Sequence, residues 1–140
     1  NTGKKIDKRA RKFLKENNLD YAHGTGHGVG FFLNVHEGPQ SINKINKVQI
    51  KKGMIISNEP GFYKKNDYGI RIENLVYVNK KNNKLFFENL TMVPIEKDFI
   101  NFNLLTVFEK NYLFKYHLDV YSKISKYLNQ KEKKWLANFI

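Results

Sequence analysis

The sequence predicts an α+β domain, because strand-like segments occupy the middle of the chain and helix-like segments lie at both ends. Residues 7–17 repeat apolar side chains at helical spacing, with Lys and Arg on the other side. From residue 105 onward, an apolar stripe between Leu113 and Leu128 predicts a long helix. No linker is long enough to divide the chain, so we expect a single domain over residues 1–140.

Short apolar or alternating segments predict the strands of this domain. They are residues 48–50, 54–59, 70–78, 85–90 and 92–95. Turn residues separate them, with Lys51–Gly53 after the first strand and Asn82–Asn83 in a position typical of a hairpin. The segment His23–Gly30 holds four glycines in eight residues, which excludes an ordinary helix or a central strand.

The composition narrows the classes of function. The chain has no cysteine, which excludes disulfides and thiolate zinc sites and suits a reducing compartment. No apolar run approaches the roughly 20 residues of a membrane-spanning helix. The net charge of +12 would suit a basic interaction domain, but the lysines are scattered among asparagines instead of forming a stripe. We therefore expect neither a nucleic-acid nor a membrane partner.

Three histidines and two glutamates are the candidates for chemistry. His23, His27 and His36 lie within fourteen residues of one another. Glu59 ends one predicted strand, and Glu73 lies in the next. Taken singly, each is more often a packed or solvated residue, and the period of two leaves Glu73 free to face solvent. Together, an imidazole and two carboxylates on neighbouring rigid elements suit a divalent metal that activates water, although three ligands are too few for a two-metal centre.

Several motifs occur in an order that resembles one family. His23–Gly30 (HGTGHGVG) is followed by Asn34–Pro39 (NVHEGP), and Asn58–Tyr63 (NEPGFY) is followed by Gly69–Asn74 (GIRIEN). Further matching segments are Asn89–Ile95 (NLTMVPI), Leu104–Thr106, Tyr116–His117 and Trp135–Leu136. This combination resembles the Xaa-Pro aminopeptidases (aminopeptidase P) of the pita-bread metallopeptidases, and the resemblance covers nearly the whole chain.

The resemblance implies a fold and an activity. The fold would be the C-terminal half of a pita-bread metallopeptidase domain, a curved and mostly antiparallel sheet with helices on its outer face. The reaction would remove the N-terminal residue from peptides whose second residue is proline. The resemblance further implies manganese (Mn2+, two ions in the complete enzyme), a homodimer and a cytoplasmic location.

The resemblance also assigns roles by position. His27 matches the histidine metal ligand, and Glu59 matches a ligand that also serves as the general base for the attacking water. Glu73 matches the carboxylate that bridges both metals. His23 and His36 match histidines that line the substrate site and stabilise the reacting peptide group.

Other residues receive weaker assignments. Arg71 matches a residue that orients the metal-binding carboxylates. Tyr63 lies in a matching segment, but we assign it no role. His117 lies on the apolar stripe of the late helix, and we interpret it as a core or interface histidine.

One departure from the family affects the ligand count. The family's first two metal ligands are a pair of aspartates from strands upstream of the helix that opens this chain. Asp7 and Asp20 lie in no matching strand, so we reject both and expect an upstream segment of the same enzyme to complete the site. Two alternatives remain: a prolidase-type dipeptidase, which shares the ligands and differs in pocket contacts, and a non-catalytic binding module that has kept the fold.

Overall fold

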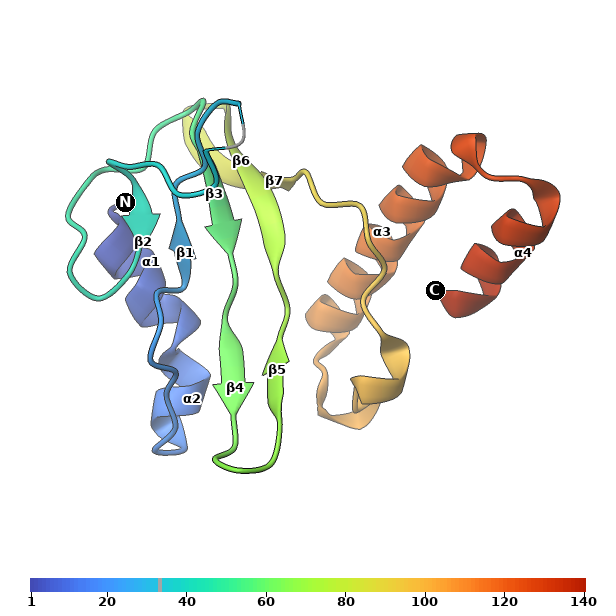
Figure 1. Ribbon diagram of the computed structural model, residues 1–140, viewed down its shortest axis with the longest axis horizontal. Helices are drawn as coiled ribbons and strands as arrows, with labels where there is room; N and C mark the ends of the chain where they lie inside the picture. Colours follow the sequence, from blue (N-terminus) through green and yellow to red (C-terminus); the bar gives the residue numbers. More distant parts are fainter. Residues whose placement is uncertain (33) are drawn as a thin grey trace. The chain divides into compact units, whose positions relative to one another are not determined.

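The computed structural model describes residues 1–32 and 34–140. Its contacts divide the chain into two compact units, Asn1–Thr91 and Met92–Ile140. Figure 1 shows helices and strands in the N-terminal unit, coloured blue to yellow, and helices in the C-terminal unit, coloured orange to red. The predicted α+β class, with antiparallel strands in the middle of the chain and helices at its ends, is confirmed.

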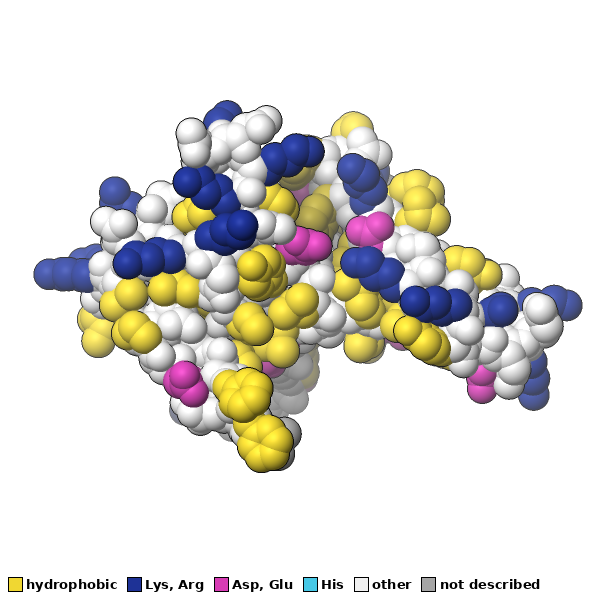
Figure 2. Space-filling view, turned by 90° about the horizontal axis from the view of Figure 1, so that it is seen from above, with side chains coloured by type: hydrophobic (Ala, Val, Ile, Leu, Met, Phe, Trp, Pro, Cys, Tyr) yellow, Lys and Arg dark blue, Asp and Glu magenta, His cyan; other side chains and the backbone are white. Residues whose placement is uncertain are grey.

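Charge is dispersed over the surface of both units. Figure 2 shows Lys and Arg side chains scattered over the visible face, interspersed with polar and hydrophobic side chains. Among the described residues, no helix combines the length and the apolar character needed to cross a bilayer.

The N-terminal unit begins with two short helices. They are α1 (Gly3–Ala10) and α2 (Lys12–Glu16). The predicted helix over residues 7–17 is therefore confirmed, but it starts earlier and is interrupted by a turn at Arg11. The strands that follow are β1 (Gly26–His27), β2 (Ser41–Ile42), β3 (Ile55–Asn58), β4 (Gly61–Tyr63), β5 (Gly69–Arg71), β6 (Asn74–Lys81) and β7 (Lys84–Asn89).

All the strand pairs are antiparallel. The strand order is β3-β6-β7 in one sheet, and β1-β2 and β4-β5 form two further pairs. The turn between β6 and β7 has positive φ angles at Asn82 and Asn83, as a tight hairpin requires, which confirms the predicted turn. An isolated bridge between Gly28 and Ile56 joins the end of β1 to β3.

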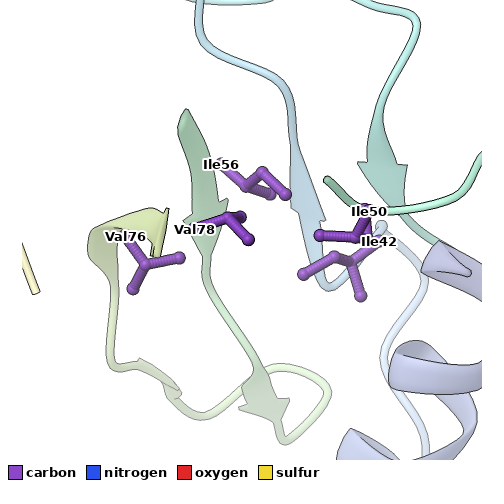
Figure 3. Packing of buried hydrophobic residues seen from close by; sticks show 5 residues of the cluster. All are labelled: Ile42, Ile50, Ile56, Val76 and Val78. Atoms are coloured by element: carbon purple, nitrogen blue, oxygen red, sulfur yellow. The ribbon is translucent and has the colours of Figure 1, made fainter. Parts of the chain in front are cut away.

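The core of this unit lies between the sheet and α1. Its buried members come from β2, β3, β6 and the segment before β3, and Figure 3 shows their side chains pointing toward one another. They are Ile42, Ile50, Ile56, Val76 and Val78. Ile6 from α1 and Met54 pack against this cluster. Val76 and Val78 share one face of β6 because side chains alternate along a strand.

The C-terminal unit is built on two helices, α3 (Val107–Ile124) and α4 (Gln130–Phe139). Both begin with a capping box, Thr106 with Glu109 and Asn129 with Glu132, which satisfies the first free backbone amides. The predicted late helix is confirmed. Its buried residues belong to the predicted apolar stripe: Tyr116, His117 and Val120. Short 3-10 helices flank α3: η1 (Lys97–Phe99), η2 (Phe102–Leu104) and η3 (Ser125–Tyr127).

The prediction of a strand over residues 92–95 is wrong. Pro94 has no amide to donate to a ladder. The hydroxyl of Tyr116 donates to the carbonyl oxygen of Val93 at 2.6 Å. The amide of Ile95 donates to Nε2 of His117 at 3.1 Å. Side chains of α3 therefore bind this backbone in place of a neighbouring strand.

Two other predicted strands differ from the structure. Residues 48–50 form only one isolated bridge, Gln49 with Thr2, because this segment pairs with the few residues before α1. The strand predicted over 70–78 is two strands, β5 and β6, and it is interrupted at Ile72 and Glu73. This interruption between β5 and β6 lies in the candidate site.

Candidate metal centre

The two glutamates face each other where an antiparallel ribbon is interrupted. β3 pairs with β6 up to Asn58↔Asn74, and β4 pairs with β5 from Gly61↔Arg71. Both pairs follow one register, in which Glu59 falls opposite Glu73. Pro60 follows Glu59 and lacks an amide, so the ladder cannot continue through it. Directly opposite residues present their side chains on the same face, where two carboxylates repel each other unless a cation lies between them.

His27 comes from β1, which lies against β3. The close approach requires Gly26, because a Cβ there would collide with the carbonyl oxygen of Ser57. The amide of His27 donates to Oγ of Ser57 at 2.9 Å. Nδ1 of His27 lies 3.0 Å from the carbonyl oxygen of Gly28, which can only accept, so we assign the ring proton to Nδ1. Nε2 is then free to bind a metal, and it lies 3.4 Å from Oε1 of Glu59.

One atom each from His27, Glu59 and Glu73 can be chosen so that all lie within 4.8 Å of one another. An imidazole nitrogen with a free lone pair and two carboxylates form a donor set that suits a divalent cation. Among the described residues, this set supplies three ligands. These residues fit one metal ion well and leave coordination positions open for further ligands.

Arg71 lies between the two carboxylates. Its Nη1 donates to Oε2 of Glu59 at 3.1 Å and lies 3.8 Å from Oε2 of Glu73. Oγ of Ser57 donates to the other oxygen of Glu59 at 2.9 Å. Contact with Tyr63 first, and then the charges of Glu59 and Glu73, raise the pKa of Arg71, so the guanidinium stays charged. Glu59 is thereby held by a donor on each oxygen.

Tyr63 joins this group to His23. Nε of Arg71 donates to the Tyr63 hydroxyl at 3.0 Å, and that hydroxyl lies 2.7 Å from Nε2 of His23. Nδ1 of His23 lies 2.7 Å from the carbonyl oxygen of Gly24, so Nδ1 carries the proton and Nε2 accepts from the tyrosine. From the sequence alone, Tyr63 had no assigned role. The register of the β4-β5 hairpin places it diagonally from Arg71, which is the signal that could have identified it.

His36 lies beside His27, the candidate histidine ligand. The rings of His27 and His36 have centroids 4.0 Å apart and meet edge to face at 76°. Backbone hydrogen bonds from Glu37 to Gly28 and from Gly28 to Gln40 hold the two segments together. The structure thus brings all the predicted site residues into one group: His23, His27, His36, Glu59, Arg71 and Glu73.

The two rejected aspartates lie in ion pairs and not in this donor set. Asp7 is 2% exposed and binds Arg11 through both carboxylate oxygens at 2.9 Å. Asp20 pairs with Lys15, Lys44 and Arg11. Hydrogen bonds from the two lysines are the main cause that lowers the pKa of Asp20. Among the described residues, the candidate donor set consists of His27, Glu59 and Glu73 and does not include either aspartate.

Comparisons with known proteins identify the family. Residues 1–80 match the model of metallopeptidase family M24, and residues 83–139 match the C-terminal region of peptidase M24. The chain is 47% identical to a probable Xaa-Pro aminopeptidase P of Coprinopsis cinerea, over 96% of this chain and 24% of that protein. It is 46% identical to Xaa-Pro aminopeptidase 1 of Dictyostelium discoideum, over 99% of this chain and 24% of that protein.

A solved structure shows the same fold. The X-prolyl aminopeptidase of Caenorhabditis elegans, described as a cytosolic enzyme with a di-nuclear active site, matches with a TM-score of 0.88 and 37% identity. The match covers 99% of this chain and 24% of that one. The chain spans about a quarter of the length of the curated relatives it matches, since each match covers 24% of the relative. The resemblance noted in the motifs is confirmed, and the chain belongs to metallopeptidase family M24.

Proposed function

We propose that residues 1–140 form the C-terminal part of the catalytic domain of an aminopeptidase that removes the N-terminal residue before proline. The observation that carries this proposal is the convergence of His27, Glu59 and Glu73 within 4.8 Å. Their arrangement beside two further histidines is what a hydrolytic metal centre needs. The names of the relatives support peptides with proline in second position as substrates.

In this proposal the described residues hold one side of the centre. His27 would hold a metal ion through Nε2, and Glu59 and Glu73 would supply carboxylate ligands, with Glu73 in the position that the family resemblance assigns to the bridging carboxylate. An upstream segment of the same enzyme supplies the remaining ligands. Two divalent ions would lower the pKa of a water shared between them and would polarise the peptide carbonyl.

The remaining residues position groups and move protons. Glu59 takes the proton of the attacking water, and Ser57 and Arg71 fix the orientation of its carboxylate. His36, exposed beside the ring of His27, binds the oxygen of the reacting peptide group. His23 faces the substrate with an orientation set by Tyr63, which is itself held by Arg71.

We further propose manganese as the metal, a homodimer as the assembly and the cytoplasm as the location. Manganese and the dimer rest on the family resemblance of the motifs. The cytoplasm rests in addition on the description of the C. elegans relative. Metal content of the purified protein and its mass in solution test the first two of these statements.

The test uses the full-length protein and an Xaa-Pro-Xaa tripeptide with added manganese. We expect release of the first residue, and we expect Glu73→Gln to lower kcat by at least about 100-fold, because a metal ligand is lost. Glu88→Gln is the matched control, since Glu88 is an exposed glutamate on β7 that hydrogen-bonds Asn79. Cleavage restricted to Xaa-Pro dipeptides would instead identify a prolidase-type dipeptidase. Metal binding without hydrolysis of either peptide would identify a non-catalytic binding module.

A further inference from the structure

A buried ion pair lies beneath the Gly-rich segment that carries two of the site histidines. Arg11 is 3% exposed and Asp7 is 2% exposed, although both are charged. Nε of Arg11 donates to both carboxylate oxygens of Asp7 at 2.9 Å. Neither residue belongs to the metal-ligand set, and buried charges are expensive unless each is paired and hydrogen-bonded. The pair therefore calls for an explanation.

One side of the pair fixes the backbone at His23. Nη2 of Arg11 donates to the carbonyl oxygen of His23 at 2.6 Å, and Nη1 donates to the carbonyl oxygen of Tyr21 at 2.7 Å. The same Nη1 donates to Asp20 at 2.6 Å. The guanidinium also lies 3.8 Å from the centre of the Tyr21 ring. A planar group with five donors can make these contacts together, and a lysine ammonium cannot.

The other side of the pair reaches the strand end that bears Glu59. Thr25 is fully buried, and its hydroxyl donates to Oδ1 of Asp7 at 2.6 Å. The hydroxyl of Tyr21 contacts Oγ1 of Thr25 at 2.5 Å and donates to it, since the proton of Thr25 is already used. The carbonyl oxygen of Thr25 accepts the amide of Glu59 at 2.8 Å. One ion pair thus connects to the backbone of a substrate-side histidine and to that of a metal-binding glutamate.

We propose that Arg11 and Asp7 are positioning residues for the site, with Arg11 acting on His23 through the histidine carbonyl and Asp7 acting on Glu59 through Thr25. This inference rests on the proposed peptidase function and extends it to residues that touch neither metal nor substrate. A displacement of about 1 Å in a catalytic group can cost up to 100-fold in rate. A rigid support below the turn therefore has a direct effect on turnover.

A double-mutant cycle on the full-length enzyme separates positioning from general stability. Arg11→Lys keeps the charge beside Asp7 but loses the donor to the His23 carbonyl. We expect kcat for the tripeptide to fall about 10-fold while manganese affinity changes less than about 3-fold. In a His23→Ala background, Arg11→Lys should change kcat less than about 2-fold, because the group that it positions is absent.

Arg9→Lys is the matched control, since Arg9 is an exposed arginine on the same helix, and it should leave kcat unchanged. A 10-fold loss repeated in the His23→Ala background would overturn the inference, as would wild-type kcat in Arg11→Lys. Crystal structures give a second readout that needs no activity. The His23 ring should move by about 1 Å in Arg11→Lys and stay in place in Arg9→Lys. An unmoved ring in Arg11→Lys also rejects the inference. If the ring is displaced in Arg11→Lys but the wild-type enzyme is inactive, only the peptidase proposal is rejected.

Discussion

The histidine side and the carboxylate side of the candidate centre are supported in different ways. The segment with His23 and His27 rests on buried polar residues, with Asp7, Arg11 and Thr25 each at most 3% exposed. On the other side, the side chains of Arg71 and Glu73 are 44% and 46% exposed. A single site therefore combines a half that rests on buried, hydrogen-bonded polar residues with a half in which Arg71 and Glu73 are open to solvent.

The difference has a physical reason. The histidine side gains its order from charge-assisted hydrogen bonds that water does not weaken. The carboxylate side places Glu59 opposite Glu73 in one register, and Arg71 offsets only part of their repulsion. We infer that the open side is where metal ions and further ligands attach, since added positive charge stabilises the facing carboxylates.

The largest expected effect compares one carboxylate from each half. Asp7→Ala leaves Arg11 buried without its main partner, so we expect a loss of about 3–5 kcal/mol in the local stability of the Gly-rich segment. Glu73→Ala removes a half-exposed carboxylate and should cost less than about 1 kcal/mol without metal. Hydrogen exchange of residues 20–28, followed by mass spectrometry in the presence of a chelator, measures both.

In hydrogen-exchange terms, Asp7→Ala should speed exchange in this segment by about 100-fold or more, and Glu73→Ala by less than about 5-fold. Lys12→Ala serves as a control for substitutions in the N-terminal helices. The side chain of Lys12 is 62% exposed and forms a surface ion pair with Glu16 at 3.7 Å, a contact that contributes little to stability. Equal effects for Asp7→Ala and Glu73→Ala would show that the two halves do not differ in rigidity.

Tyr63→Phe should give a smaller effect, because it cuts the connection between the halves without removing either. The hydroxyl accepts from Arg71 and donates to His23, so its loss leaves Nε2 of His23 without a donor. We expect kcat for an Xaa-Pro tripeptide to fall about 5- to 10-fold, the equivalent of one hydrogen bond of about 1–1.5 kcal/mol. Steady-state kinetics of the full-length enzyme measures this change.

Tyr68→Phe is the matched control, because Tyr68 is exposed in the same hairpin and contacts Phe62 and not the site histidines. An unchanged kcat in Tyr63→Phe would mean that the two halves act independently. A loss as large as that of Glu73→Gln would mean that the tyrosine touches the reacting groups and does more than orient His23.

The sequence predicted much of the site because its residues lie in short, ordered motifs. The period of two placed Arg71 and Glu73 on one face, and the structure finds them 3.8 Å apart. The break in the strand at Glu73 was not predicted, because alternation of side chains does not report whether backbone hydrogen bonds continue. The hydrogen bonds stop here because Pro60, on the strand opposite, has no amide to donate.

The supporting residues were harder to predict, because they act through contacts between distant segments. Asp7 and Arg11 have the spacing of a helical ion pair, which is usually a solvated surface feature. Only the folded chain shows that the guanidinium turns toward the His23 carbonyl. The strand predicted over residues 92–95 failed for a similar reason, because side chains of α3 bind that backbone.

The smallest expected effect extends the comparison to His117, a histidine that is buried by the fold and takes no part in the site. The prediction of a core position is confirmed, since it is 7% exposed. Burial first, and the charge of Lys97 second, lower the pKa of His117 below its usual value. The folded state therefore binds a proton less readily than the unfolded state. The contribution of His117 to the free energy of unfolding is fully present above roughly pH 6.5 and falls as the pH drops below it.

Thermal unfolding at about pH 7.5 and about pH 5.5 tests this expectation. The fall in Tm between the two conditions should be larger in the wild type than in His117→Gln, which has no titrating group and can still accept from Ile95. His36→Gln removes an exposed histidine and should leave the wild-type fall unchanged. A reduced fall in both variants would mean that burial of His117 is not the cause of the acid sensitivity, and the contrast between the buried histidine and the exposed one would be lost.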